Sequence, residues 1–233
     1  MFNKKIVVET LYCCKEPALL YGVFFLPTLF KSQLPSGTEF NNLQFLLLAI
    51  CMALLQSSLV YYLLKNTSRD FKKEMYGLSP FRLLDLLWGI VGWIALGISI
   101  AFALFVLFLL PDSFSEQLRP PFQWRFYRTD LIPLVIITLG TGAFFEEFFF
   151  RGYLYRKFHF CTGSPLASAF LTTCFFALGH GYQGLGGLIL SFFLGGILMV
   201  LRWYTHSIWA ATLTHGLYNG SVLLLSLAME VKF

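Results

Sequence analysis

The stretch LIPLVIITLGTGAFFEEFFFRGYLY, residues 131–155, is apolar and long enough to cross a membrane, yet it contains Glu146, Glu147 and Arg151. A charged side chain at the centre of a bilayer helix costs about 2.5–3.5 kcal/mol on insertion scales. Leu or Val would serve packing better, so packing alone does not explain these residues. Three ionisable groups so close together within one span therefore indicate a functional site.

The composition of the whole chain is that of a membrane protein. Hydrophobic residues make up 57% of the chain and charged residues only 12%, about half the charged fraction of a soluble domain. Apolar windows of about 20 residues recur, each long enough to cross a hydrocarbon core of about 30 Å. We expect an all-α, polytopic transmembrane helix bundle with about seven spans, in a range of about six to eight. The expected spans are 16–31, 43–64, 83–110, 131–155, 165–180, 185–201 and 207–228.

The spans belong to one membrane domain, because no internal repeat and no long linker divides the chain. Residues 1–130 supply N-terminal transmembrane helices without a diagnostic motif, and residues 131–228 carry the polar groups. With seven spans, most Lys and Arg residues lie on the side of the N-terminus, which the positive-inside rule makes cytoplasmic. The residues on that side are Lys4, Lys5, Lys15, Lys65, Arg69, Lys72, Lys73, Arg82, Arg156, Lys157 and Arg202. Topology and anionic lipid headgroups explain the net charge of +5, so nucleic acid is not an expected partner.

The spacing of the polar residues groups them on helix faces. His215 and Asn219 are four residues apart, so they can point into one cavity together. Glu147 and Arg151 have the same spacing, which suits a charge-stabilising pair. Glu146 lies about 100° around the helix from Glu147, so the two acids face different neighbours and do different jobs.

Depth in the membrane tests whether these groups can meet. At about 1.5 Å per residue, Glu146 lies roughly 15 Å and His215 roughly 14 Å from the cytoplasmic ends of their spans. His180, at the end of the fifth span, lies roughly 24 Å from that side. Tilt of the fifth helix, or a deep entry of the turn before it, must absorb a difference of about 10 Å.

Together these residues describe hydrolysis without a Ser or Cys nucleophile. A carboxylate and an imidazole, directly or around a bound metal, can deprotonate water and deliver it to a carbonyl. A second imidazole with a nearby amide can donate hydrogen bonds to the oxyanion. Here the chain resembles the CPBP family of intramembrane proteases, the Abi or type II CAAX prenyl protease group. The blocks that carry the resemblance are Glu146-Glu147-Phe-Phe-Phe-Arg151, Phe176-Ala-Leu-Gly-His180 and His215-Gly-Leu-Tyr-Asn219.

The resemblance covers about residues 131–225 and implies a role for each matched position. Glu146 is implied to be the acid/base that activates water with His180. His215 and Asn219 are implied to stabilise the oxyanion or to complete a metal shell. The implied supporting residues are Glu147 and Arg151.

The residues leave open whether a divalent metal such as zinc takes part. Glu146, His180 and His215 could supply the three protein ligands that a catalytic zinc ion uses beside water. No HExxH is present, however, and the Asn219 amide is a poor zinc ligand. The sequence therefore favours metal-free catalysis, with a Glu146–His180–His215 metal site as the alternative.

The expected function is an intramembrane endopeptidase whose substrate is a membrane-associated protein or peptide and whose surroundings are the lipid bilayer. One alternative is a catalytically silent bacteriocin-immunity or scaffolding protein, because relatives of the family are associated with self-protection. The other is a proton-coupled transporter, against which the chain shows no paired halves. The short chain resembles bacterial relatives, so we expect a multi-pass protein of the bacterial inner (plasma) membrane.

Overall fold

A computed structural model describes residues 4–29, 39–67, 71–109 and 126–230, and within these ranges the chain is helical or irregular, without a strand. The N-terminal helices are α1 (Lys4–Leu29), α2 (Leu43–Thr67) and α3 (Leu83–Leu109). The later helices are α5 (Ile132–Glu147), the π-helix η5 (Phe148–Leu154), α6 (Tyr155–Thr162), α7 (Pro165–Gly179), α8 (Gly184–Thr205) and α9 (Trp209–Glu230). Short 3-10 turns are η1 (Glu39–Asn41), η2 (Lys73–Tyr76), η4 (Thr129–Leu131) and η6 (Gly181–Gln183).

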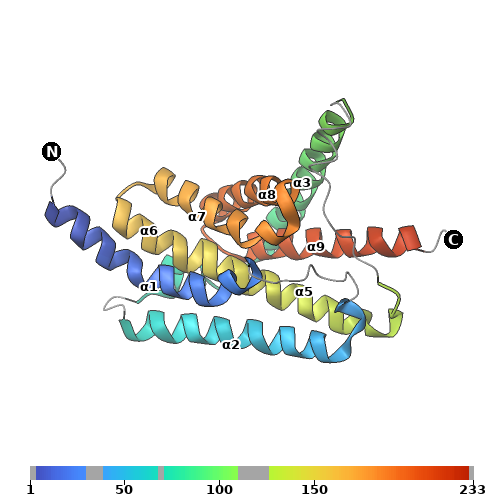
Figure 1. Cartoon of the computed structure of the whole chain (residues 1–233), viewed down its shortest axis with the longest axis horizontal. Coiled ribbons are helices and arrows are strands. Elements are labelled where there is room, and N and C mark those ends of the chain that lie inside the picture. The colour runs from blue at the N-terminus through green and yellow to red at the C-terminus, as the bar shows by residue number, and fades with distance from the viewer. Residues whose placement is uncertain (1–3, 30–38, 68–70, 110–125, 231–233) are drawn as a thin grey trace.

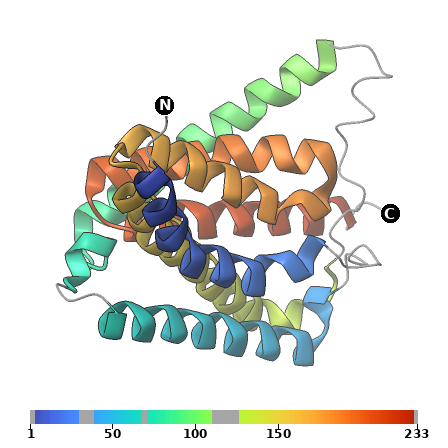
Figure 2. The same cartoon turned by 60° about the vertical axis from the view of Figure 1, so that its left-hand side comes forward.

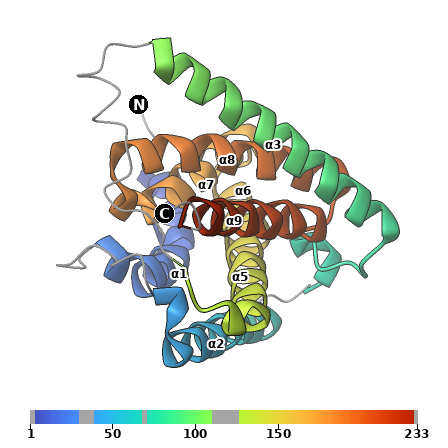
Figure 3. The ribbon, with the colours of Figure 1, turned by 90° about the vertical axis from the view of Figure 1, so that its right-hand side faces the viewer.

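The helices form one bundle around the rod that α5, η5 and α6 make together (Figure 1). Figure 2 shows α1 crossing over this rod, and Figure 3 shows α2 and α9 lying on different sides of α5. α3 packs against α9, and its far end diverges from the bundle (Figures 2 and 3). The rod that contains the two glutamates is therefore the central element of the fold.

Within the described residues, four helical stretches are long and apolar enough to cross a membrane, which indicates a multi-pass membrane protein. They are Leu43–Asn66, Leu83–Ala103, Thr129–Thr162 and Gly181–Thr205. Pro165–Gly179 is a shorter apolar helix at the fifth expected span. α1 and α9 lie where the first and last spans are expected, but within the described residues neither meets the same criteria of length and hydropathy for a membrane span. The all-α fold is confirmed, whereas the number of seven crossings stays a prediction.

The turn between α6 and α7 corrects the predicted depth of the site. The helix that carries Glu146 does not end at residue 155 but continues to Thr162. Glu146 lies sixteen residues before Thr162 and His180 sixteen residues after Ser164, which is about 24 Å in both cases. The predicted difference of about 10 Å was wrong, because it measured Glu146 from a helix end that the fold does not have.

Local sequence signals explain why this reversal occurs where it does. Gly163 ends α6 in the left-handed conformation, with φ of 65°, which glycine adopts readily. Ser164 caps α7 by accepting a hydrogen bond from the N–H of Ala167 at 3.3 Å. Pro165 then occupies the first helical position, where its missing N–H leaves no bond unmade.

Aromatic packing fixes the face of the central rod that carries Glu146. The ring of Phe25 on α1 packs against Phe145, Phe149 and Phe150, with ring centroids 6.0, 5.3 and 4.9 Å away. Tyr21 adds a hydrogen bond of 3.0 Å from its hydroxyl to the carbonyl of Phe175 on α7. The apolar residues around the two glutamates therefore form a protein core that includes α1.

The turn between α8 and α9 fixes the start of the last helix. His206 ends α8 with φ of 55°, and Ser207 Oγ accepts the N–H of Trp209 at 3.1 Å. The Trp209 indole N–H donates to the carbonyl of Ser79 at 2.7 Å, which ties this turn to the segment before α3. Because His215 is only six residues further, these bonds also set its depth and direction.

Candidate active site

Glu147, Arg151 and His215 form a buried network between the central rod and α9. Arg151 Nη1 lies 2.8 Å from Glu147 Oε1, and His215 Nδ1 lies 2.9 Å from the same oxygen. All three side chains are buried, and Glu147 is 0% exposed. Arg151 Nη2 also donates to the backbone carbonyl of Gly195 on α8 at 3.1 Å. One carboxylate therefore joins two helices, and its Oε1 already accepts two hydrogen bonds.

Glu146 is placed differently from its neighbour. Its side chain is 25% exposed, and its Oε2 lies 3.8 Å from His180 Nε2 and 3.9 Å from His215 Nε2. These distances are too long for hydrogen bonds, and Glu146 Oε2 has no hydrogen-bond partner among the described residues. One carboxylate oxygen thus faces an imidazole nitrogen from each of two histidines.

The far nitrogens of the two imidazoles determine their tautomers. His180 Nδ1 lies 2.9 Å from the carbonyl of Phe176, and His215 Nδ1 lies 2.9 Å from the Glu147 carboxylate. A carbonyl and an ionised carboxylate can only accept, so both Nδ1 atoms carry hydrogen. In the neutral rings, both Nε2 atoms then face Glu146 as acceptors.

Asn219 lies one helical turn beyond His215 on α9 and is half-buried. Within the described part of the chain, no hydrogen bond or ion pair joins its amide to the two glutamates or to the histidines. The structure therefore brings together Glu146, Glu147, Arg151 and both histidines, whereas Asn219 is placed only by its position one helical turn from His215.

The π-helix η5 begins directly after Glu147 and contains Arg151. Its wider turn places residues four apart nearly above one another, which suits the 2.8 Å bond between these two side chains. Gly152 allows the η2 turn to pack closely against η5, because a Cβ at this position would lie 2.9 Å from the carbonyl oxygen of Tyr76. π-helical turns are frequent at functional sites, and this one is built into the acidic motif itself.

Sequence reasoning missed two contributors to this site. Gly195 supplies the carbonyl for Arg151, and Phe176 packs its ring between Arg151 and the two imidazoles. Phe176 belongs to the middle motif block, but its spacing to His180 predicts only that both share a helix face. Gly195 has no chemical signature, because its contribution is a backbone carbonyl and close approach.

The residues as placed do not form a metal shell. No group of three or more His, Cys, Asp and Glu side chains in the described ranges is arranged to hold a metal ion. The separations of 3.8 and 3.9 Å exceed the roughly 3.3 Å expected between ligands of tetrahedral zinc with bonds of about 2.0–2.1 Å.

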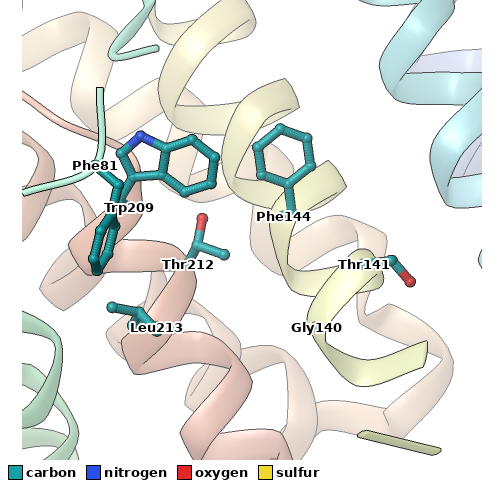
Figure 4. A pocket seen from close by; sticks show the side chains of 7 residues that line it. All are labelled: Phe81, Gly140, Thr141, Phe144, Trp209, Thr212 and Leu213. Carbon is teal, nitrogen blue, oxygen red and sulfur yellow. The ribbon is translucent and has the colours of Figure 1, made fainter. Parts of the chain in front are cut away.

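A groove of about 360 Å³ lies between α5 and α9, apart from the acidic cluster (Figure 4). Its lining consists of Phe81, Gly140, Thr141, Phe144, Trp209, Thr212 and Leu213. None of these side chains is ionisable, so the groove has no group that could activate water. The chemistry therefore resides with the glutamates and histidines.

Residues 128–221 match the family described as type II CAAX prenyl endopeptidase Rce1-like. The matched segment runs from just before η4 into α9, and it contains all seven residues that define the three motif blocks. The predicted family resemblance is confirmed over this segment. No curated protein and no solved structure matches the chain.

Proposed function

We propose that the protein is an intramembrane endopeptidase, because residues 128–221 are an Rce1-like type II CAAX prenyl endopeptidase domain. The observation that carries the proposal is the convergence of Glu146 Oε2 with the Nε2 atoms of His180 and His215. A carboxylate oxygen that has no hydrogen-bond partner among the described residues and faces two imidazoles, on a side chain that is 25% exposed, is a suitable general base for water.

The reaction begins with a water molecule held between Glu146 and His180. Glu146 takes one proton while His180 Nε2 accepts a hydrogen bond from the other, and the hydroxide attacks the peptide carbonyl. The Asn219 amide donates to the oxyanion, and so does His215 from Nε2 when both its nitrogens carry hydrogen. Glu147, behind His215, stabilises that imidazolium, as a carboxylate does behind other catalytic histidines. The proton on Glu146 then passes to the leaving amine.

The position of Glu146 supports a substrate that enters the membrane. It lies seventeen residues from Thr129 and sixteen from Thr162, so it is about 25 Å from either end of its helical rod. The scissile peptide bond must therefore reach a point near the middle of the span. A membrane-anchored protein or a membrane-associated peptide meets this requirement.

The decisive comparison uses Glu146→Gln, which keeps the size of the side chain but removes its basicity. We expect cleavage of a library of membrane-anchored peptides in detergent to fall by about 10²–10⁴-fold. Glu74→Gln is the matched control, because Glu74 is exposed on η2 and its side chain makes no hydrogen bond or ion pair with a described residue. Equal cleavage by wild type and Glu146→Gln would overturn the proposal.

Two other outcomes point to the alternatives. A wild-type protein that cleaves no peptide in the library favours the catalytically silent immunity or scaffolding role. Proton-coupled uptake into liposomes that is lost in Glu146→Gln favours the transporter. The finer topology belongs to the same proposal: seven crossings in a bacterial plasma membrane with a cytoplasmic N-terminus. We expect a reporter fused to the N-terminus to be accessible only from the cytoplasm.

A further inference from the structure

Phe176 lies where the two halves of the site meet. It is buried on α7, and its ring centroid is 4.7 Å from that of His180. The His215 ring lies 5.9 Å away at 77°, in an edge-to-face arrangement. The guanidinium carbon of Arg151 is 4.3 Å from the centroid of the Phe176 ring. One apolar side chain thus contacts three polar groups of the site.

Phe176 acts on each imidazole in two ways. Its backbone carbonyl lies 2.9 Å from His180 Nδ1 and fixes that tautomer, while its ring packs on the same imidazole. Its ring also contacts His215 directly and supports Arg151, which in turn holds the Glu147 carboxylate against His215 Nδ1. Both imidazoles therefore depend on the position of this one ring.

The contact with Arg151 needs an aromatic ring. The face of a phenyl ring is electrostatically negative, and it attracts a desolvated cation more strongly than an exposed one. Leu would fill part of the same space but would present no such face to the guanidinium. Loss of the ring would leave Arg151 with the Glu147 carboxylate, the Gly195 carbonyl and the more distant Phe150 ring, whose centroid is 6.0 Å from the guanidinium carbon.

Gly195 on α8 confines the ring from the other side. A Cβ at this position would lie 3.1 Å from Phe176 Cδ1, 3.1 Å from Thr173 Cγ2 and 3.5 Å from Arg151 Nη2. The two separations of 3.1 Å are tighter than ordinary contact, so even one methyl group would push on the ring. Gly196, the next residue, faces open space and offers a matched control.

We propose that Phe176 is a positioning residue that keeps the Nε2 atoms of His180 and His215 turned towards Glu146 Oε2. The backbone of Gly195 limits how far the Phe176 ring can move. The catalytic consequence of this inference rests on the proposed protease function, but its geometric part does not. Two measurements therefore separate the failure of one from the failure of the other.

The first measurement is nitrogen-15 NMR of the protein with labelled histidine rings, in detergent. A fixed tautomer gives well-separated Nδ1 and Nε2 shifts, and a ring that exchanges tautomers brings them together. In Phe176→Leu we expect the shifts of His180 and His215 to converge, while His159 and His206 stay as in wild type. Ring-current loss alone cannot produce this convergence, because it hardly changes nitrogen shifts. Unchanged shifts at both site histidines would overturn the inference.

Gly195→Ala keeps the test decisive if Phe176→Leu does not fold. The added methyl group displaces the ring without removing it, so a smaller convergence of the same shifts is expected. Gly196→Ala, which meets nothing, should give the wild-type spectrum. Identical spectra for the two glycine variants would show that the position of the Phe176 ring does not determine the tautomers of the two imidazoles.

The second measurement is the kinetics of cleavage for the same variants. A misplacement of about 1 Å can cost about 10²-fold, so Phe176→Leu should lower kcat about 100-fold with KM little changed. Phe158→Leu is the control, because Phe158 is a buried core residue whose ring packs on Phe175, away from the site. Wild-type kcat in Phe176→Leu would overturn the inference and leave the protease proposal standing. Absence of cleavage by wild type would contradict the protease proposal, and the NMR result would still decide whether Phe176 positions the imidazoles.

Discussion

Arg151→Met tests whether the buried ion pair stabilises the fold. Arg151 is 1% exposed, and its partner Glu147, at 2.8 Å, is 0% exposed. Removal of one member of a buried pair costs about 3–5 kcal/mol, because the other charge is left in a poorly solvating interior. His215 still contacts the Glu147 carboxylate in this variant, so we expect the lower end, about 3 kcal/mol. That loss corresponds to roughly a 150-fold change in the folded-to-unfolded ratio.

Two further variants separate pairing from the loss of a large side chain. In the double variant Glu147→Met/Arg151→Met, neither charge remains, so its cost should fall short of the sum of the two single variants by about 0.5–3 kcal/mol. Lys157→Met is the matched control, because the Lys157–Glu16 pair at 3.1 Å is partly exposed. Its loss should cost no more than about 1 kcal/mol.

The assay is reversible unfolding by SDS in mixed micelles, followed by circular dichroism of the helices. The free energy of unfolding is compared among the wild type, both single variants, the double variant and the control. The reasoning fails if Arg151→Met costs no more than Lys157→Met, or if the two single effects add without coupling. In either case the pair would be an incidental contact of the fold.

Three further predictions concern the site and its support. Asn219→Ala should lower kcat by about 10²–10³-fold in the peptide-cleavage assay with little change in KM, and an unchanged kcat would remove the amide from oxyanion stabilisation. Gly152→Ala should lower the thermal stability, because its Cβ would lie 2.9 Å from the Tyr76 carbonyl oxygen, whereas Gly142→Ala meets open space and should gain up to about 1 kcal/mol. A change in thermal stability of the same sign in Gly152→Ala and Gly142→Ala would contradict this prediction. Cleavage should survive a strong chelator, with no stoichiometric metal by elemental analysis; loss of activity that zinc restores would contradict it.

Short-range spacing predicted the parts of the site that one helix contains. Glu147 and Arg151 are four residues apart, and the structure joins them at 2.8 Å. The different environments of the adjacent acids also follow from the helical turn, since Glu146 is 25% exposed and Glu147 is buried. The motif blocks identified the family, because three patterns in order are far more specific than any one of them.

Long-range contacts could not be read from the sequence in the same way. The bond between His215 and Glu147 joins residues on different helices, and its partner choice depends on how α9 rotates against the central rod. The error in the depth of Glu146 came from placing the end of its helix at charged residues, although the helix ends at Gly163. The π-helix was also unforeseen, because the run Phe148–Leu154 fits an ordinary helix by composition.

The charges of the cluster explain why the two adjacent acids divide their work. Glu146 and Glu147 contribute two negative charges and Arg151 one positive charge, so one negative charge remains when both histidines are neutral. Glu147 Oε1 already accepts bonds from Arg151 and His215, whereas Glu146 Oε2 accepts none from the described residues. A proton taken from water by Glu146 moves this negative charge onto the attacking oxygen, so the total charge of the site stays the same where a change in net charge would be costly. The same step leaves the Arg151–Glu147–His215 network intact, so the site can accept and return a proton without rearranging its support.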